Sequence, residues 1–319
     1  QAIDIDSLMA VELRVLLHKH LGISVPAMRL QRNLTVEGLS DLLLTELAHT
    51  DSSAAGAADM LTVHEITCAD GLVCYGHLSL PTGPGPHPAV VVCPPAAGGA
   101  LDSDGNYAHI SEHAPLRAAG FAVFTVDRRG APGHGAEYQT PRAFLAGGGD
   151  IDDADDIAAA ADYLAGLGQI DADRISILGT SRGAFTALLA LERGPRRWRS
   201  GVLLMGVYDL AALDITEPLR ALLPEHYDQA AFEAYVTAPH RQPLADLTAI
   251  GAPILLVHGD ADRLVPLQQS LDLADRLQQA RAQGRLITVA GLGHDSEHLE
   301  QVWNDLWPQI TGFLASDRQ

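Results

Sequence analysis

The chain has 319 residues, of which 47% are hydrophobic and 19% charged, a balance typical of globular rather than disordered proteins. Its formal net charge of -19 argues against nucleic acid as a partner, because phosphates would be repelled. No apolar run approaches the roughly 18 residues that a membrane helix needs, so no membrane partner is expected.

The cysteines and the first residue bear on the compartment and the extent of the chain. Cys68, Cys74 and Cys93 cannot form a complete set of disulfide pairs, and they lack the spacing of a metal site. Because no secretory segment opens the sequence either, we expect a cytoplasmic protein without a bound metal. Position 1 is Gln rather than Met, which indicates a piece excised from a longer polypeptide.

Residues 1–48 are expected to form helices. Apolar residues recur there at helical intervals, namely Leu8, Val11 and Val15, followed by Leu39, Leu42, Leu43 and Leu47. Gly22 ends the first predicted helix, and Thr35 is the predicted N-cap of the last. Residues 49–60 are small and polar without periodicity, which predicts a flexible linker.

From about residue 61, short apolar runs alternate with helical patterns. The runs predict strands at residues 73–80, 89–93, 122–126, 175–178, 201–205, 254–257 and 286–289. Helices are predicted between them, for example at 157–167, 184–191 and 267–281. Runs that are apolar on both faces suit a parallel sheet covered by helices, so residues 61–319 are predicted to form a doubly wound, mostly parallel α/β domain. Residues 210–248 are predicted to form a helical cap that lines an acyl pocket, with ordinary helix core as the alternative.

A nucleophile is predicted where one strand passes into a helix. The run at 174–178 leads directly into Gly179-Thr180-Ser181-Arg182-Gly183, and a helical pattern follows. This is the context of a G-x-S-x-G turn, in which a strained backbone exposes the serine hydroxyl. The bare pattern is weak, because Gly and Ser are common here, but the flanking elements make Ser181 the candidate nucleophile.

A base and an acid follow in the order that such a serine requires. A serine hydroxyl is a poor nucleophile without a base, and His294 comes just after the last predicted strand. Asp262 follows the preceding strand and is the candidate acid that orients the histidine. A lone Asp or His is more often a surface or core polar residue, but the order Ser181, Asp262, His294 is that of a hydrolase triad.

Residues 61–315 resemble the prolyl-oligopeptidase and dienelactone-hydrolase branch of the α/β-hydrolase superfamily. The resemblance lies in the serine turn and in residues 86–92, 126–130, 258–262 and 291–294. It implies an α/β-hydrolase fold with Ser181 as nucleophile, His294 as general base and Asp262 as acid. Asp260 is the rival acid or, alternatively, a loop cap.

One turn departs from this family. Where relatives usually carry His-Gly after the third strand, this chain has residues 93–99 beginning Cys93-Pro94-Pro95. Proline lacks an N–H, so neither Pro94 nor Pro95 can donate to an oxyanion. The backbone N–H groups of Arg182 and Ala96 are the predicted donors, with that of Ala97 next.

Asp6-Ser7-Leu8 stands at the head of the first predicted helix, and the helical pattern continues to residue 48. On this motif and the helices that follow it, residues 1–48 resemble the second half of an acyl carrier protein of the type built into polyketide synthases. It implies that Ser7 bears 4'-phosphopantetheine if the carrier is complete in the parent protein, whereas a plain N-cap is the alternative. Asp4 replaces the family's usual Gly, and the carrier's first helix is missing, so we expect 1–48 to be a partial, loosely held domain.

The charged residues near the predicted site have bland explanations as well. The acidic run at 150–156 is expected to open a helix rather than bind a metal. Arg128, Arg129 and Arg182 are candidates to contact a carboxylate or phosphate, or to pair with nearby acids.

The leading hypothesis is a serine-dependent thioesterase at the end of a polyketide synthase. It would take an acyl thioester from a carrier domain, with upstream synthase modules as partners, and release it by hydrolysis or cyclisation through an acyl-enzyme. One alternative is an esterase or peptidase that acts on free small substrates. The other is a non-catalytic scaffold that docks carriers.

Overall fold

The computed structural model describes residues 61–95, 113–127, 149–209, 247–294 and 300–316. By its internal contacts the chain divides into two units, Gln1–Leu61 and Thr62–Gln319, and all described residues except Leu61 belong to the second. The predicted carrier segment, the linker and nearly all of the predicted cap lie outside the described residues.

The described strands form one mostly parallel sheet. Their order is β1-β2-β4-β3-β5-β6-β7-β8. The strands are β1 (Leu61–Thr67), β2 (Val73–Ser79), β3 (His87–Cys93), β4 (Ala122–Asp127), β5 (Ile170–Thr180), β6 (Gly201–Leu204), β7 (Ile254–Gly259) and β8 (Gly284–Val289). β2 pairs with β4 antiparallel, and every neighbouring pair from β4 to β8 is parallel.

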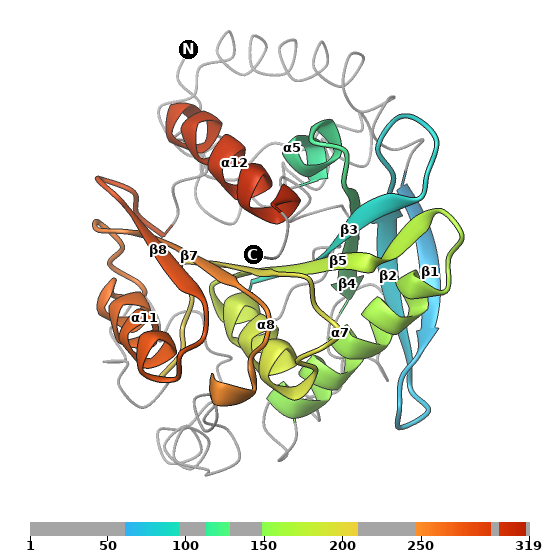
Figure 1. The fold of residues 1–319 in the computed structure, drawn as a ribbon, viewed down its shortest axis with the longest axis horizontal. Helices are drawn as coiled ribbons and strands as arrows, with labels where there is room; N and C mark the ends of the chain where they lie inside the picture. Colours follow the sequence, from blue (N-terminus) through green and yellow to red (C-terminus); the bar gives the residue numbers. More distant parts are fainter. Residues whose placement is uncertain (1–60, 96–112, 128–148, 210–246, 295–299, 317–319) are drawn as a thin grey trace, which may run out of the picture. The chain divides into compact units, whose positions relative to one another are not determined.

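Helices cover both faces of this sheet (Figure 1). On one side lie α7 (Gly149–Ala165), α8 (Arg182–Arg193) and α11 (Gln268–Gln279), and on the other lie α5 (His113–Ala118) and α12 (Glu300–Ala315). The predicted α/β-hydrolase fold with a doubly wound sheet is therefore confirmed for the described residues.

Strand β3 shows why the sheet buries both faces. Ala89, Val91 and Cys93 belong to the core under α7 and α8, whereas Val90 and Val92 belong to the core under α5 and α12. Successive side chains of a strand point to opposite faces, so a strand between two helical layers must be apolar at every position.

Three described elements, β1, α5 and α12, were not predicted from the sequence. β1 lies at the edge of the sheet and exposes Thr62, Val63 and Glu65, so it lacks the apolar run of a central strand. α5 is short, and α12 contains Pro308.

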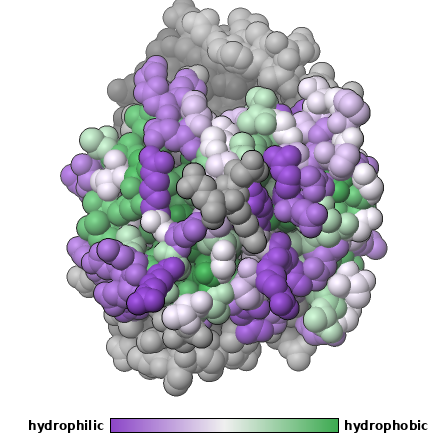
Figure 2. Space-filling model, viewed as in Figure 1, coloured by the Kyte–Doolittle hydropathy of each residue, from purple (hydrophilic) through white to green (hydrophobic). Residues whose placement is uncertain are grey.

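On the face drawn in Figure 2, hydrophilic and hydrophobic residues are interspersed. Among the described residues, no helix is both long and apolar enough to cross a bilayer.

Candidate active site

Ser181 occupies a strained turn between β5 and α8. β5 ends at Thr180 and α8 begins at Arg182, and the serine between them has φ 55° and ψ -118°. Few residues other than glycine adopt positive φ, and such strain persists only where the surroundings enforce it. The Ser181 N–H donates to the carbonyl of Leu204 at the end of β6, at 2.8 Å, which ties the turn to the next strand.

Two glycines allow this turn to pass close to its neighbours. A Cβ atom on Gly179 would collide with the backbone of Gly183, and one on Gly183 would collide with the carbonyl oxygen of Cys93. The turn is thus packed against itself and against the end of β3, which leads toward Ala96. Both glycines of the G-x-S-x-G pattern have a steric reason in this structure.

His294 joins the serine to Asp262. Its Nε2 lies 3.0 Å from Ser181 Oγ, and its Nδ1 lies 2.7 Å from Asp262 Oδ2. A carboxylate only accepts hydrogen bonds, so Nδ1 carries the proton and Nε2 is left to accept the serine proton. The structure therefore brings together the three predicted side chains from the ends of β5, β7 and β8, in the arrangement of a nucleophile, a base and an orienting acid.

The Asp262 carboxylate accepts hydrogen bonds from His294 and from two backbone N–H groups, and His258 lies close to it. Its Oδ1 accepts the backbone N–H groups of Leu264 at 2.9 Å and Val265 at 2.8 Å. Burial alone would raise the pKa of the Asp262 carboxyl, but hydrogen bonds from His258, from His294 and from the backbone outweigh it and hold this pKa well below its usual range. The acid is therefore ionised at neutral pH and can orient an imidazole N–H.

This lowered pKa predicts a pH dependence of stability. Because the folded state binds the Asp262 proton less tightly than the unfolded chain, the ionised carboxylate stabilises the fold above the unfolded pKa of about 3.9, and that contribution is lost as pH falls through the folded value. Urea unfolding of the parent and of Asp262→Asn should show a stability difference at pH of about 7 that narrows below pH of about 4. A difference that stays constant with pH would contradict this assignment.

Asp260, the rival acid, has a different partner. Its Oδ1 accepts the backbone N–H of Gly291 at 2.7 Å, so it links the loop after β7 to the loop after β8. The two loops also touch at Gly259, where a Cβ atom would collide with the carbonyl of Leu292. This contact brings the Asp262 loop beside the His294 loop.

His258 lies next to Asp262 and supports it, a role that was not predicted from the sequence. Its ring is fully buried, with Nδ1 2.7 Å from Ser270 Oγ and Nε2 2.9 Å from the carbonyl of Val265. Nε2 also lies 3.5 Å from Asp262 Oδ2. A carbonyl only accepts, so Nε2 carries a proton, and Nδ1 shares a hydrogen bond with the Ser270 hydroxyl. The only sequence signal was its place in the 258–262 stretch of the resemblance.

Replacing His258 should damage the fold more than replacing its partner Ser270. His258→Leu leaves the carbonyl of Val265 and the hydroxyl of Ser270 buried without this partner, and we expect it to lower the free energy of unfolding by about 3 kcal/mol. Ser270→Ala leaves the Nδ1 of His258 without this partner but keeps the hydrogen bond to the carbonyl of Val265, so it should cost less, about 1 kcal/mol. Urea unfolding measures both. Equal, small losses would show that His258 is not a required support.

Gln269, next to Ser270, holds the segment after β6. Its Oε1 accepts the backbone N–H groups of Tyr208 at 2.8 Å and Asp209 at 2.7 Å, and its Nε2 donates to the carbonyl of Asp209 at 2.9 Å. In the same segment the Val207 N–H lies 3.4 Å from the carbonyl of Ser181. Adjacent residues of α11 thus brace both the nucleophile turn and the acid loop, which no local sequence pattern indicated.

The remaining predicted site residues divide into described and undescribed ones. The backbone N–H of Arg182 lies at the first position of α8, directly after the serine, where an N–H can face a developing oxyanion. Ala96 and Ala97, as well as Ser7, Arg128 and Arg129, lie outside the described residues.

The chain was compared with known protein families once this geometry was established. A model of the prolyl oligopeptidase family matches residues 108–315, which is more than half of the chain. The chain belongs to the prolyl oligopeptidase family. Its predicted class, a serine hydrolase, agrees with this membership. A second family model, described as a phosphopantetheine attachment site, matches residues 2–43.

Two curated relatives and one solved structure are similar to this chain. A probable dipeptidyl-aminopeptidase B of Fusarium vanettenii is 33% identical over 191 residues, covering 57% of this chain and 19% of the relative. An uncharacterized protein of Mycobacterium tuberculosis is 29% identical over 243 residues, covering 72% of this chain and 71% of the relative. The crystal structure of Porphyromonas gingivalis dipeptidyl peptidase 4 has the same fold, with a TM-score of 0.63 at 23% identity over 81% of this chain and 35% of that one. The chain thus spans well under half of the two peptidases.

Proposed function

We propose that this chain hydrolyses peptide or ester bonds of small substrates through an acyl-enzyme on Ser181. The observation that carries the proposal is the pair of hydrogen bonds of His294, to Ser181 at 3.0 Å and to a buried, ionised Asp262 at 2.7 Å. An imidazole held in this way directs its Nε2 at the Ser181 hydroxyl on the strained turn. That arrangement suits acyl transfer to serine.

Three side chains and two backbone N–H groups have roles in the proposed reaction. His294 Nε2 takes the proton of Ser181 as the hydroxyl oxygen attacks the substrate carbonyl, and Asp262 stabilises the imidazolium that results. The backbone N–H of Arg182 donates to the oxyanion, and that of Ala96 is the proposed second donor. The imidazolium then protonates the leaving group. In the second half of the reaction, His294 deprotonates a water molecule, which attacks the acyl-enzyme and releases the acid from Ser181.

The substrate class rests on the family. The Fusarium vanettenii relative is named a probable dipeptidyl-aminopeptidase, and the structural neighbour is a dipeptidyl peptidase. Both names concern proteins much longer than the shared region, so they support peptide-like substrates for this chain without identifying them.

A matched panel of leaving groups tests the proposal. One acyl group, for example a blocked amino acid, would be offered as an anilide, as a simple ester and as a pantetheine thioester, to the parent and to Ser181→Ala. We expect Ser181-dependent turnover of the anilide or the ester without preference for the thioester. Turnover of the thioester alone would overturn the small-substrate proposal.

The match of residues 2–43 to a phosphopantetheine attachment site favours a second candidate function. In this version residues 1–48 are a partial carrier domain with Ser7 as attachment point, 49–60 a linker and 61–319 the release domain with a cap at 210–248. The arm would supply a thioester as the acyl donor. Ser181 would then release an acyl chain delivered by upstream modules of a polyketide synthase, as a free acid or a lactone. A short flexible tether raises the local substrate concentration to the millimolar range without new contacts.

Intact-mass analysis of the acyl-loaded chain tests this second candidate. Parent, Ser7→Ala and Ser181→Ala would be treated with a phosphopantetheinyl transferase and an acyl donor. We expect the parent to load and then lose the acyl group, Ser181→Ala to load and retain it, and Ser7→Ala not to load. Equal rates of loss from the parent and from Ser181→Ala would sink the release function while leaving hydrolysis of free substrates open.

A further inference from the structure

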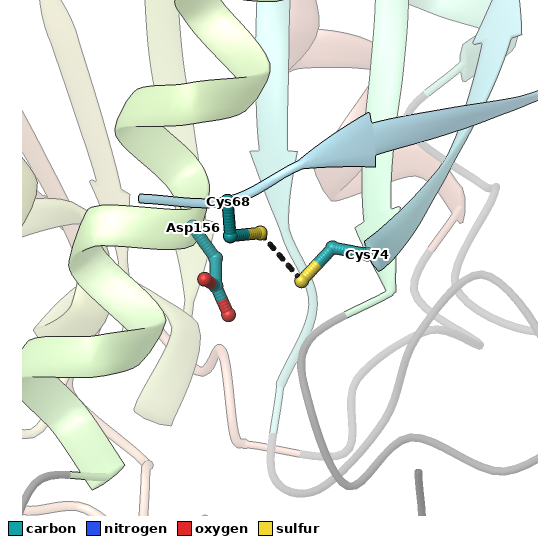
Figure 3. A group of neighbouring side chains, drawn as sticks. All are labelled: Cys68, Cys74 and Asp156. Atoms are coloured by element: carbon teal, nitrogen blue, oxygen red, sulfur yellow. Dashed lines mark hydrogen bonds between the residues drawn. The ribbon is translucent and has the colours of Figure 1, made fainter. Parts of the chain in front are cut away.

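Two cysteines lie together under the hairpin at the edge of the sheet. Cys68 follows β1 and opens a turn in which the Gly71 N–H donates to the Cys68 carbonyl at 2.9 Å, and Cys74 lies on β2. Cys68 is 4% and Cys74 0% exposed, and their sulfur atoms point toward one another beside Asp156 of α7, which is 1% exposed (Figure 3). Ligand atoms of all three lie within 4.8 Å of one another.

The separation of the two sulfur atoms favours one of two chemistries. Their Sγ atoms lie 2.8 Å apart, and the cysteines are not disulfide-bonded. Two thiolates bound to one zinc ion at about 2.3 Å would lie about 3.8 Å apart, so a metal would have to push them apart by about 1 Å. A disulfide of about 2.05 Å needs a smaller movement, an approach of about 0.75 Å.

We propose that Cys68 and Cys74 form a reversible intramolecular disulfide. With oxidised glutathione as the oxidant, the thiolate of Cys68 attacks one glutathione sulfur, breaks its S–S bond and releases one glutathione. The thiolate of Cys74 then attacks Cys68 Sγ in the mixed disulfide and releases the second glutathione. The protein loses two protons and two electrons, and the glutathione disulfide gains them.

The position of Cys68 and Cys74 in the fold indicates which thiolate attacks glutathione first and what the disulfide changes in the protein. Cys68 is the less deeply buried residue of the two and belongs to an edge hairpin, the kind of element that opens locally without global unfolding. The hydrogen bonds that join His294 to Ser181 and to Asp262 involve neither cysteine. Oxidation should therefore staple the hairpin and raise stability while leaving hydrolysis unchanged.

Alkylation followed by intact-mass analysis of the full chain tests this proposal. The reduced protein would be incubated with oxidised glutathione at about pH 8, unfolded and alkylated with iodoacetamide. We expect one alkylated cysteine, Cys93, and the loss of two hydrogen atoms, together with a rise of about 5 °C in the midpoint of thermal unfolding. Dithiothreitol should restore three alkylation sites and the original midpoint.

Single variants separate the steps. Cys74→Ser should accumulate glutathione bound to Cys68, whereas Cys68→Ser should react far more slowly, and Cys93→Ala is the matched control that should still form the disulfide. These outcomes do not depend on the proposed hydrolase activity.

Two results would overturn the disulfide. One is three alkylated cysteines in the parent after oxidation at a temperature where Cys74→Ser takes up glutathione. The other is stoichiometric zinc in the purified parent that is absent from Cys68→Ser and Asp156→Asn, which would make the three residues a metal site.

Discussion

Ser181→Ala should lower kcat by about 10⁴-fold or more on any substrate that the parent hydrolyses. Among the described residues, the Ser181 hydroxyl oxygen is the atom placed to bond to a carbonyl carbon while His294 Nε2, at 3.0 Å, takes its proton. Single-turnover kinetics and labelling by a fluorophosphonate probe measure the loss. His294→Ala should cause a similar loss, because the nucleophile and its base act as a unit.

Stability measurements distinguish a lost nucleophile from a lost fold. Ser181→Ala keeps the Cβ atom and the backbone bond to Leu204, so its urea unfolding curve should match that of the parent within about 1 kcal/mol. An intact fold with no probe labelling in the parent itself would instead favour the scaffold function. Retained activity in Ser181→Ala would remove Ser181 from the mechanism.

Gly259→Ala should destabilise the fold by about 3 kcal/mol and also reduce activity. A Cβ atom at this position collides with the backbone carbonyl of Leu292, which cannot rotate away as a flexible side chain can. Relief of the collision requires the loops after β7 and β8 to separate. Those loops carry Asp262 and His294, so the 2.7 Å hydrogen bond between them should lengthen. Urea unfolding and kcat/KM would be measured together.

Gly312→Ala is the matched control for this substitution. Gly312 lies in α12, and a Cβ atom there meets nothing within 4 Å among the described residues. Because alanine favours a helix interior over glycine, this variant should gain up to about 1 kcal/mol and keep full activity. If both variants behaved alike, the close approach at Gly259 would not control the site.

The fold class and the three central site residues could be predicted because local patterns carry them. The β5 sequence, apolar at Ile175, Ile177 and Leu178, runs into a Gly-flanked serine, and such a turn specifies its own geometry through steric limits on neighbouring residues. Asp262 and His294 were identified from their places after predicted strands, since carboxyl ends of parallel strands meet at one edge.

The supports of the site depend on contacts that no local pattern encodes. His258, Ser270 and Gln269 act across elements, and a buried histidine or glutamine has no sequence period that distinguishes it from a surface one. Asp260 and Asp262 stand two residues apart in similar contexts. The geometry of the loop after β7 gives them different partners: Asp260 accepts a hydrogen bond from the Gly291 N–H, whereas Asp262 accepts one from His294.

By itself, the sequence determined the alternation of strands and helices, the nucleophile turn and the similarity of residues 2–43 to a carrier site, because each depends on neighbours in the chain. The tertiary structure alone decided which side chains support Asp262 and His294, and that the sulfur atoms of Cys68 and Cys74 lie 2.8 Å apart. Those outcomes are set by how strands cross and loops approach in space. Distances between such segments follow from packing of the whole sheet rather than from the order of residues.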